Sequence, residues 1–214
     1  MTYGVAFPLL AALAGLLLGP AAEFLIARTL PRLGGLPAHK VRITTAAVTA
    51  LLFGLLAWRF GFSPELPAFF LLALLGVQLS RIDFVLHLLP NPLVLILLGG
   101  GVAFLGVAAV VSPAWPELIR GLAGAATLFA GYLILGLISP GSLGMGDVKL
   151  AAPLGLYLGY LGWEQVLFGG LLGFVVGGVL TVLMLRLQPK EKPVETAHGP
   201  AMFAAAMGVV LVLQ

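Results

Sequence analysis

Eight long apolar stretches alternate with short polar connections along the chain. They cover about residues 4–27, 43–58, 66–79, 93–111, 118–138, 148–161, 166–185 and 201–213. Each stretch is continuously apolar, without the alternation of apolar and polar residues that a membrane β-barrel strand shows, so each predicts a helix. Several are shorter than the roughly 20 residues that a perpendicular membrane helix needs, and 148–161 also contains Pro153.

The positive charges favour a topology in which all eight stretches cross a membrane. One side then receives Arg28, Arg32, Lys40, Arg42, Arg81, Lys149, Arg186, Lys190 and Lys192. The other side receives only Arg59 and Arg120. Basic connections stay in the cytoplasm, so the side with nine charges is predicted to be cytoplasmic. If 148–161 did not cross, the basic segment 186–192 would fall outside, so we predict that this stretch spans too.

Composition supports a membrane protein with several spans. The chain has 214 residues, of which 61% are hydrophobic and only 9% charged, and its mean hydropathy is +1.14. No soluble globular domain has this composition. The predicted fold class is therefore all-α: a polytopic protein of the plasma membrane with about eight transmembrane helices, forming one domain over residues 1–214. No basic segment precedes the first stretch, so we expect no cleavable signal peptide.

Several classes of function are disfavoured by composition. The chain contains no cysteine, which excludes disulfides, zinc–thiolate sites and thiol nucleophiles. Its basic residues are spread over several connections and form no single patch, so no nucleic-acid partner is expected. Gly169, Gly173 and Gly177 recur at a spacing of four residues and predict a face for close helix packing. The polar segment 188–199 is predicted to be a solvated connection.

Two aspartates stand at matching places among the apolar stretches. Asp83 follows one stretch, in SRIDFVLHLLPNP, and Asp147 follows another, in GSLGMGDVKL. The two stretches between them return the chain to the side it left, so both aspartates are predicted to lie at the same face of the membrane. Placing acidic residues at a membrane boundary costs free energy, so their presence points to a functional site. The lipid bilayer itself is one expected partner of the protein.

Each aspartate has a structural interpretation as well as a chemical one. Asp147 follows Gly144 and Gly146 and is predicted to lie at a helix N-terminus, where it could simply be a cap. Asp83 could be a boundary acid beside Arg81. Together the two aspartates suggest a catalytic role, because two neighbouring carboxyl groups can share a proton and act as base and acid on a water molecule. The glycines would leave room for a peptide backbone beside the carboxylate.

Other hydrolytic mechanisms fit the sequence less well. The HExxH pattern of zinc proteases is absent, and the three histidines, His39, His87 and His198, are far apart. We therefore expect no metal and no cofactor. Ser142 and His87 could suggest a serine protease, but the sequence around Ser142 is no nucleophile elbow and offers no third group. His87 is interpreted as a boundary residue, and Glu23 could face either the bundle interior or the lipid surface.

Three segments match the motifs of a known family. In IDFVLHLLPNPL an aspartate is followed seven residues later by proline and then asparagine, at Asp83, Pro90 and Asn91. The segment GMGDVKLAAPLGLYLG contains a GxGD motif that continues into Val-Lys-Leu, and HGPAM places Gly199 and Pro200 before the last stretch. In this order they resemble the motifs of the type IV prepilin peptidases, membrane aspartic proteases that remove the leader from pilin-like precursors.

The resemblance implies a function and a set of site residues. It implies an endopeptidase in which Asp83 and Asp147 are catalytic and Gly144, Gly146 and Lys149 contact the substrate. It also implies a prepilin or pseudopilin precursor as partner, with a short basic leader, a glycine before the cut and a hydrophobic helix after it. Cleavage is expected at the cytoplasmic face of the membrane.

The sequence departs from the larger members of that family in two places. Many members carry a cytoplasmic insert with two CxxC pairs after the first span, where this chain has only the short connection 29–42. Many also carry Gly-Ser-Phe-x-Asn in the first span, where this chain has GPAAE at 19–23. Those members also N-methylate the new N-terminus, so the resemblance favours proteolysis and leaves methylation in doubt.

Two other functions compete with this interpretation. In a small ion- or proton-coupled transporter the two acids would relay protons, but such acids are expected near mid-membrane in broken helices and in repeated halves. Here they lie at boundaries and no repeat is visible. An assembly subunit with a decayed active site is the third interpretation, and the intact aspartates and GxGD motif argue against it.

Overall fold

The structure is a computed structural model that describes residues 4–138, 143–187 and 197–213, with side chains described outside 180–187. Ser142, Lys190 and Lys192 therefore lie outside the described residues, as does most of the polar segment 188–199. The expectations attached to them stay predictions from sequence.

Eight α-helices form the described part of the chain, which confirms the predicted all-α fold class. They are α1 (Ala6–Thr29), α2 (His39–Phe60), α3 (Leu66–Leu86), α4 (Asn91–Val111), α5 (Trp115–Ile138), α6 (Met145–Leu161), α7 (Trp163–Leu187) and α8 (Gly199–Val212), with a short 3₁₀ helix, η1 (Pro31–Leu33), after α1. Within the described ranges, α1 to α5 are long and apolar enough to cross a membrane. The segment Trp163–Val179 of α7 and the whole of α8 are shorter apolar helices. The chain is a multi-pass membrane protein.

Two helices extend by four residues or more beyond the apolar stretches that predict them. Helix α2 begins at His39, four residues before the predicted start, and α3 continues to Leu86, seven residues past the predicted end. Polar residues around the predicted end of α3 have partners within the bundle. Gln78 is fully buried and its amide faces the Gly19 carbonyl oxygen at 3.5 Å, and Arg81, in the extension, donates to Gln78 Oε1 at 3.4 Å. Because tertiary contacts satisfy these groups, the helix continues where hydropathy alone predicts an end. Asp83 consequently lies inside α3.

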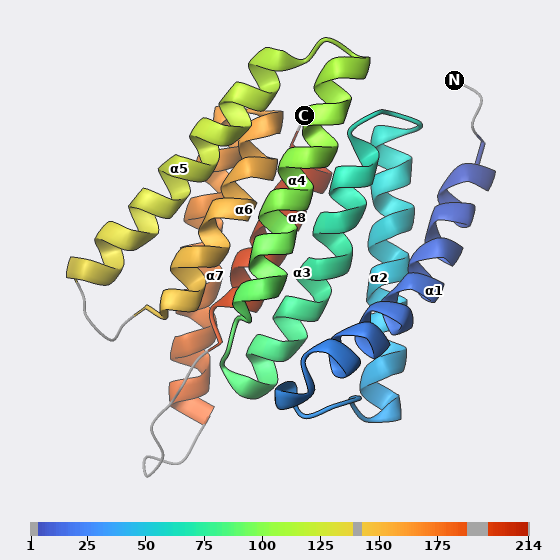
Figure 1. Ribbon diagram of the computed structural model, residues 1–214. Helices are drawn as coiled ribbons and strands as arrows, with labels where there is room; N and C mark the ends of the chain where they lie inside the picture. The colour runs from blue at the N-terminus through green and yellow to red at the C-terminus, as the bar shows by residue number, and fades with distance from the viewer. Residues whose placement is uncertain (1–3, 139–142, 188–196, 214) are drawn as a thin grey trace.

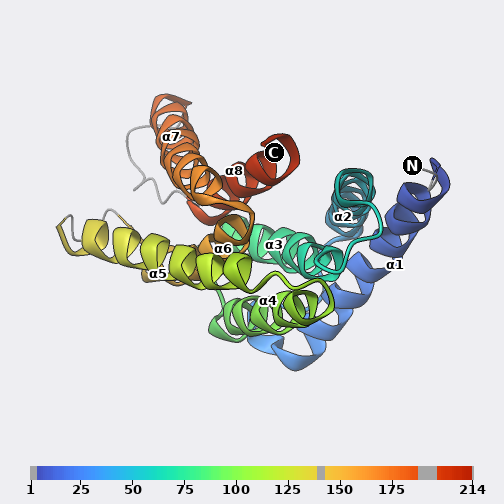
Figure 2. The same ribbon diagram turned by 90° about the horizontal axis from the view of Figure 1, so that it is seen from above.

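Helix α6 is the centre of the bundle. It contacts α4, α5, α7 and α8, while α3 joins it to the α1–α2 pair through contacts with α1, α2, α4 and α8 (Figures 1 and 2). Nearly every residue from Val148 to Tyr160 is buried, and the helix continues through Pro153 without interruption. With 17 residues it is about 25 Å long. Its burial among neighbouring helices explains why a short stretch with a proline is stable there.

Glycines bring α5 and α6 into backbone contact. A Cβ atom on Gly124 would lie 2.5 Å from the Gly155 carbonyl oxygen, so any larger residue would force the two helices apart. The glycine spacing of four residues predicts a packing face on α7 and does not predict this contact between α5 and α6. The predicted face on α7 is also buried, with Gly169 against Leu158 of α6 and Gly173 beside the Tyr132 hydroxyl.

Arg59 and Arg120, the two basic residues on the side with few charges, each donate hydrogen bonds to carbonyl groups at the C-terminal end of a neighbouring helix. Arg120 of α5 donates hydrogen bonds to the last carbonyl groups of α6, at 2.8 Å to Gly159, 2.6 Å to Tyr160 and 3.1 Å to Leu161. Arg59 of α2 likewise donates to the Leu213 carbonyl oxygen at the end of α8. Carbonyl groups at a helix end lack partners and carry partial negative charge, so a cation there is stabilising.

We expect Arg120→Ala to lower the stability of the bundle by about 2 kcal/mol, because it removes charge-assisted hydrogen bonds from three carbonyl groups at one helix end. Thermal unfolding of the purified protein in detergent measures this. Arg32→Ala is the matched control, since Arg32 is an exposed arginine of η1, and we expect a change within about 0.5 kcal/mol. Equal unfolding temperatures for the two variants would contradict the proposed capping role.

Candidate active site

The two aspartates lie at the same end of the bundle, as their two-span separation predicts. Asp83 is in the last turn of α3 and Asp147 is in the first turn of α6, and both helix ends lie beside the start of α8 at the lower end of Figure 1. Only 6% of Asp83 and 8% of Asp147 is exposed. The two carboxyl groups are close enough to interact electrostatically.

The carboxyl group of Asp83 is held by the backbone of α8. The Gly199 N–H, at the first residue of that helix, donates a hydrogen bond of 3.0 Å to Asp83 Oδ2. A Cβ atom at position 199 would lie 2.8 Å from the same oxygen, so only glycine leaves room for the carboxylate at this approach. The helix N-terminus also presents positive partial charge to the acid.

Asp147 is held by its own helix start. Its Oδ2 accepts a hydrogen bond of 3.3 Å from the Gly144 N–H, and Gly144 is the N-cap of α6. The capping interpretation and the chemical one are thus compatible, because the capping carboxylate also interacts electrostatically with Asp83. A Cβ atom on Gly146 would lie 3.1 Å from the Leu89 Cβ atom, so Gly146 allows the connection after α3 to pack against α6.

Leu89 links the two halves of the site. Its side chain is buried, faces Gly146 of α6, and would lie 3.5 Å from a Cβ atom at Gly199 of α8. The connection between α3 and α4 therefore packs between the helix starts that hold the two carboxyl groups.

Two predicted neighbours of the site have other contacts. His87 ends α3 with a left-handed backbone (φ 48°), its N–H donates to the Asp83 carbonyl oxygen at 2.8 Å, and its side chain is exposed. It therefore lies at the helix boundary and also interacts electrostatically with Asp83. Lys149 Nζ is an exposed donor to Asn91 Oδ1 of α4, at 3.1 Å. Lys149 also borders a cavity of about 330 Å³ between α4, α5 and α6.

An aromatic cluster beside the carboxylates was not predicted. The Tyr132 ring of α5 stacks on Phe174 of α7, with centroids 4.5 Å apart, and the His198 ring lies 5.7 Å from Phe174. Tyr132 interacts electrostatically with Asp147. Burial lowers the pKa of His198, which favours the neutral ring at neutral pH. The position of His198 directly before the Gly-Pro start of α8 was the only sequence signal for this cluster.

Glu23 faces the bundle interior, which resolves the alternatives that the sequence leaves open. Only 1% of this residue is exposed. Its Oε1 accepts a hydrogen bond from the Thr45 hydroxyl, and its Oε2 lies 3.6 Å from Arg42 Nε in an ion pair. Arg81 of α3 adds an electrostatic interaction. These contacts tie α1 to α2 and α3.

The arrangement has the groups that general acid–base hydrolysis requires. Two buried carboxyl groups at one end of the bundle interact electrostatically, and each accepts a hydrogen bond from a backbone N–H at a helix start. The helices that carry them, α3 and α6, are held within the bundle. Among residues 4–138, 143–187 and 197–213, no cluster of three or more His, Asp or Glu side chains is arranged to hold a metal ion.

Comparisons with known proteins agree with the motifs. The model of the type IV leader peptidase family matches residues 68–182, more than half of the chain, and this region contains both aspartates. A prepilin leader peptidase/N-methyltransferase of Stutzerimonas stutzeri is 36% identical over 167 residues, which cover 76% of this chain and 55% of that protein. The protein of the same name in Pseudomonas aeruginosa is 36% identical over 155 residues, covering 71% and 51%.

A third relative has a similar level of identity. The prepilin leader peptidase/N-methyltransferase of Bacillus subtilis is 34% identical over 163 residues, covering 75% of this chain and 61% of that protein. The chain thus spans between about half and three fifths of the length of these curated relatives. No solved structure matches the chain.

Proposed function

This chain belongs to the type IV leader peptidase family, and from that premise we propose that it is an aspartic endopeptidase acting on type IV prepilin-like precursors. It removes their short leader at the cytoplasmic face of the membrane. The observation that carries the proposal is that two buried carboxyl groups, Asp83 and Asp147, lie at the same end of the bundle and interact electrostatically, with Asp83 held by the start of α8.

Asp83 and Asp147 act together on one water molecule. One carboxylate takes a proton from the water while its oxygen attacks the carbonyl carbon of the cleaved peptide bond. The other carboxyl group, protonated, donates its hydrogen to the carbonyl oxygen. As the tetrahedral intermediate collapses, the C–N bond breaks and the leaving amine takes up the proton held by the first carboxyl group. One hydroxyl of the intermediate re-forms the C=O bond and returns its proton to the second carboxylate, which restores both groups to their starting states. The hydrogen bonds from Gly199 and Gly144 keep both carboxyl groups in place.

Residues around Asp147 contact the substrate in this proposal. Gly144 and Gly146 let the peptide backbone pass beside the carboxylate, and Lys149 lies on the next turn of α6, with its amine beside Asn91. The precursor, a prepilin or pseudopilin, is the partner. No metal and no cofactor take part in the reaction as proposed.

The transporter alternative gains no support from the geometry. Its acids would lie in broken helices near mid-membrane, whereas Asp83 and Asp147 lie within one turn of the ends of continuous helices. The proposal is also limited to proteolysis. The names of the relatives include N-methyltransferase, but the segments that the resemblance connects with methylation differ in this chain.

Co-expression with a prepilin of Pseudomonas aeruginosa in a host without its own prepilin peptidase tests the proposal. We expect a smaller product, and mass spectrometry of its N-terminus should locate one cut directly before the hydrophobic segment. With the purified protein and added S-adenosylmethionine, we expect no gain in mass of one methyl group. An uncut precursor would contradict the peptidase activity, and a methylated product would contradict its restriction to proteolysis.

A further inference from the structure

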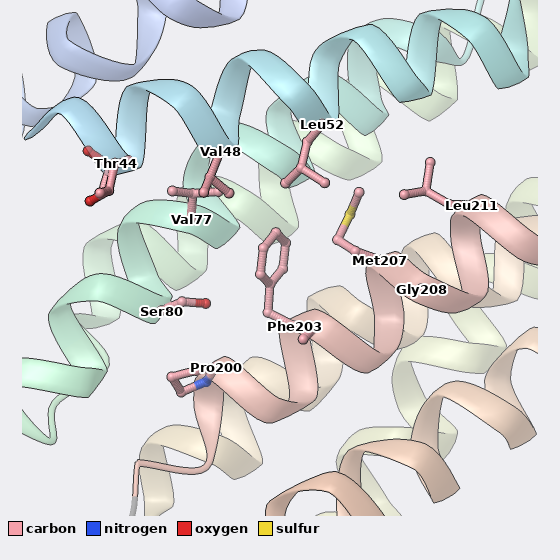
Figure 3. A pocket seen from close by; sticks show the side chains of 12 residues that line it. Thr44, Val48, Leu52, Val77, Ser80, Pro200, Phe203, Met207, Gly208 and Leu211 are labelled. Atoms are coloured by element: carbon pink, nitrogen blue, oxygen red, sulfur yellow. The ribbon is translucent and has the colours of Figure 1, made fainter. Parts of the chain in front are cut away.

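An apolar groove runs along the side of the bundle between α2 and α8, with α3 as its floor (Figure 3). Its volume is about 450 Å³. Val48 and Leu52 form the α2 wall, and Met207 and Leu211 form the α8 wall. Along α8 the groove extends from Pro200 to Leu211, which is about 16 Å or three turns of helix.

One end of the groove reaches the candidate active site. Pro200 lines this end and directly follows Gly199, whose N–H binds the Asp83 carboxylate. Ser80 lines the same end from α3 and precedes Asp83 by one helical turn. The groove is thus continuous with the backbone that positions one of the two carboxyl groups.

Polar groups occur only at that end of the groove. Thr44, Thr45 and Ser80 are the hydroxyl side chains that line it, and the remaining lining residues are apolar. The Ser80 hydroxyl is buried and has no hydrogen-bond partner in the described part of the chain, and Figure 3 shows it directed toward the α8 side. An unpaired buried hydroxyl is costly unless a ligand supplies a partner.

The uncharged lining of the groove favours a peptide over an anionic lipid as its occupant. A phospholipid with an anionic headgroup would favour a basic side chain at the membrane boundary, but the residues that line this groove include no lysine or arginine. A peptide whose helix ends at the site needs neutral groups that bond to its freed backbone, and an apolar wall for the rest. Hydroxyls at one end and aliphatic side chains beyond them match that pattern.

We propose that this groove receives the apolar helix of the precursor, with the peptide bond to be cut at the Ser80–Pro200 end. The proposal rests on the proposed function, since it assumes that the substrate is cut at the carboxylates. The helix lies along α8 and against α2, and the Ser80 hydroxyl donates to a backbone carbonyl of the segment that connects helix and leader.

Gly208 allows the groove to be filled without disturbing the fold. It lines the groove and is exposed, and no atom lies within 4 Å of a Cβ atom built on it. Gly99 of α4 has the same properties but lines neither cavity. Gly208 lies nine residues from the start of α8 and Gly99 eight residues from the start of α4, so Gly208→Phe and Gly99→Phe add the same side chain at a similar depth.

Cleavage by these variants is measured in phosphatidylethanolamine–phosphatidylglycerol vesicles on full-length Pseudomonas aeruginosa prepilin and on a short water-soluble peptide that spans the cut. We expect Gly208→Phe to lower kcat/KM for the prepilin at least tenfold through KM, and Gly99→Phe to change it less than about twofold. Both should cleave the short peptide as the unmodified protein does. Normal prepilin cleavage by Gly208→Phe, or equal losses on both substrates, would overturn the proposal.

Cross-linking tests the groove independently of catalysis and of variant folding. A photoreactive benzoylphenylalanine replaces Leu52 in the groove or, as control, Leu95 beside the other cavity, in the Asp147→Asn background. We expect the Leu52 position to capture prepilin and the Leu95 position to capture none. Capture of lipid alone at Leu52 would overturn the groove assignment. Capture of prepilin by a chain whose unmodified form cuts nothing would refute the peptidase proposal and leave the groove assignment supported.

Discussion

Asp147→Asn should abolish cleavage of the precursor while the protein stays folded in the membrane. Asparagine keeps the size and shape of the side chain, and its amide oxygen can still accept the hydrogen bond from the Gly144 N–H. It can neither take a proton from water nor hold one for the carbonyl oxygen. Since general acid–base groups contribute about 10²- to 10⁴-fold each, we expect at least a hundredfold loss of kcat.

Asp83→Asn should cause a loss of similar size, because the two carboxyl groups act on the same water molecule. The double variant should lose little more than either single variant, since groups that act as a unit are not additive. Glu164→Gln is the control: Glu164 is an exposed acid in the first turn of α7. Near-normal turnover by either aspartate variant, measured by product formation in vesicles, would refute the assignment of that residue.

Gly199→Ala should reduce kcat about a hundredfold with little effect on stability. The added methyl group would lie 2.8 Å from Asp83 Oδ2 and 3.3 Å from its Cγ atom, so the carboxyl group must move. A displacement of about 1 Å at a reacting group costs on the order of 10²-fold in rate. Stability should change little, because alanine is favoured over glycine in helices.

The matched control for Gly199→Ala is Gly106→Ala on α4, where nothing lies within 4 Å of the added atom. Thermal unfolding should give similar temperatures for both variants, whereas kcat should fall only for Gly199→Ala. If kcat stayed normal, the hydrogen bond from the Gly199 N–H would be a structural contact of α8 and would have no part in positioning Asp83.

Continuous apolar runs predict the number and order of the helices, because a membrane core requires every backbone group to be bonded within a helix. They do not predict the end of α3. Gln78 and Arg81 lower its hydropathy, but contacts with Gly19 and Glu23 of α1 keep this segment helical. Those partners lie more than fifty residues away in sequence.

The pairing of Asp83 with Asp147 could be predicted because it depends only on counting two spans between them. The groups that position Asp83 could not. The Gly199 N–H is 116 residues distant, and a glycine before a span has many possible roles. The cluster of Tyr132 and His198 depends on which faces of α5 and α8 meet, and apolar helices buried on several sides give no periodic pattern that identifies a face.

The arginine contacts at the far end of the bundle affect the positions of the two carboxyl groups at the site. Arg120 fixes the upper end of α6 and Arg59 fixes the upper end of α8, while the opposite ends of these helices carry Asp147 and Gly199. In a helix about 25 Å long, such as α6, a tilt of about 5° would move the far end by about 2 Å. The Arg120 contacts therefore limit the displacement of Asp147, and the Arg59 contact limits that of the Gly199 N–H, which binds Asp83 of α3. Hydrogen bonds at one end of the bundle thus help to keep the two carboxyl groups in place relative to each other at the opposite end.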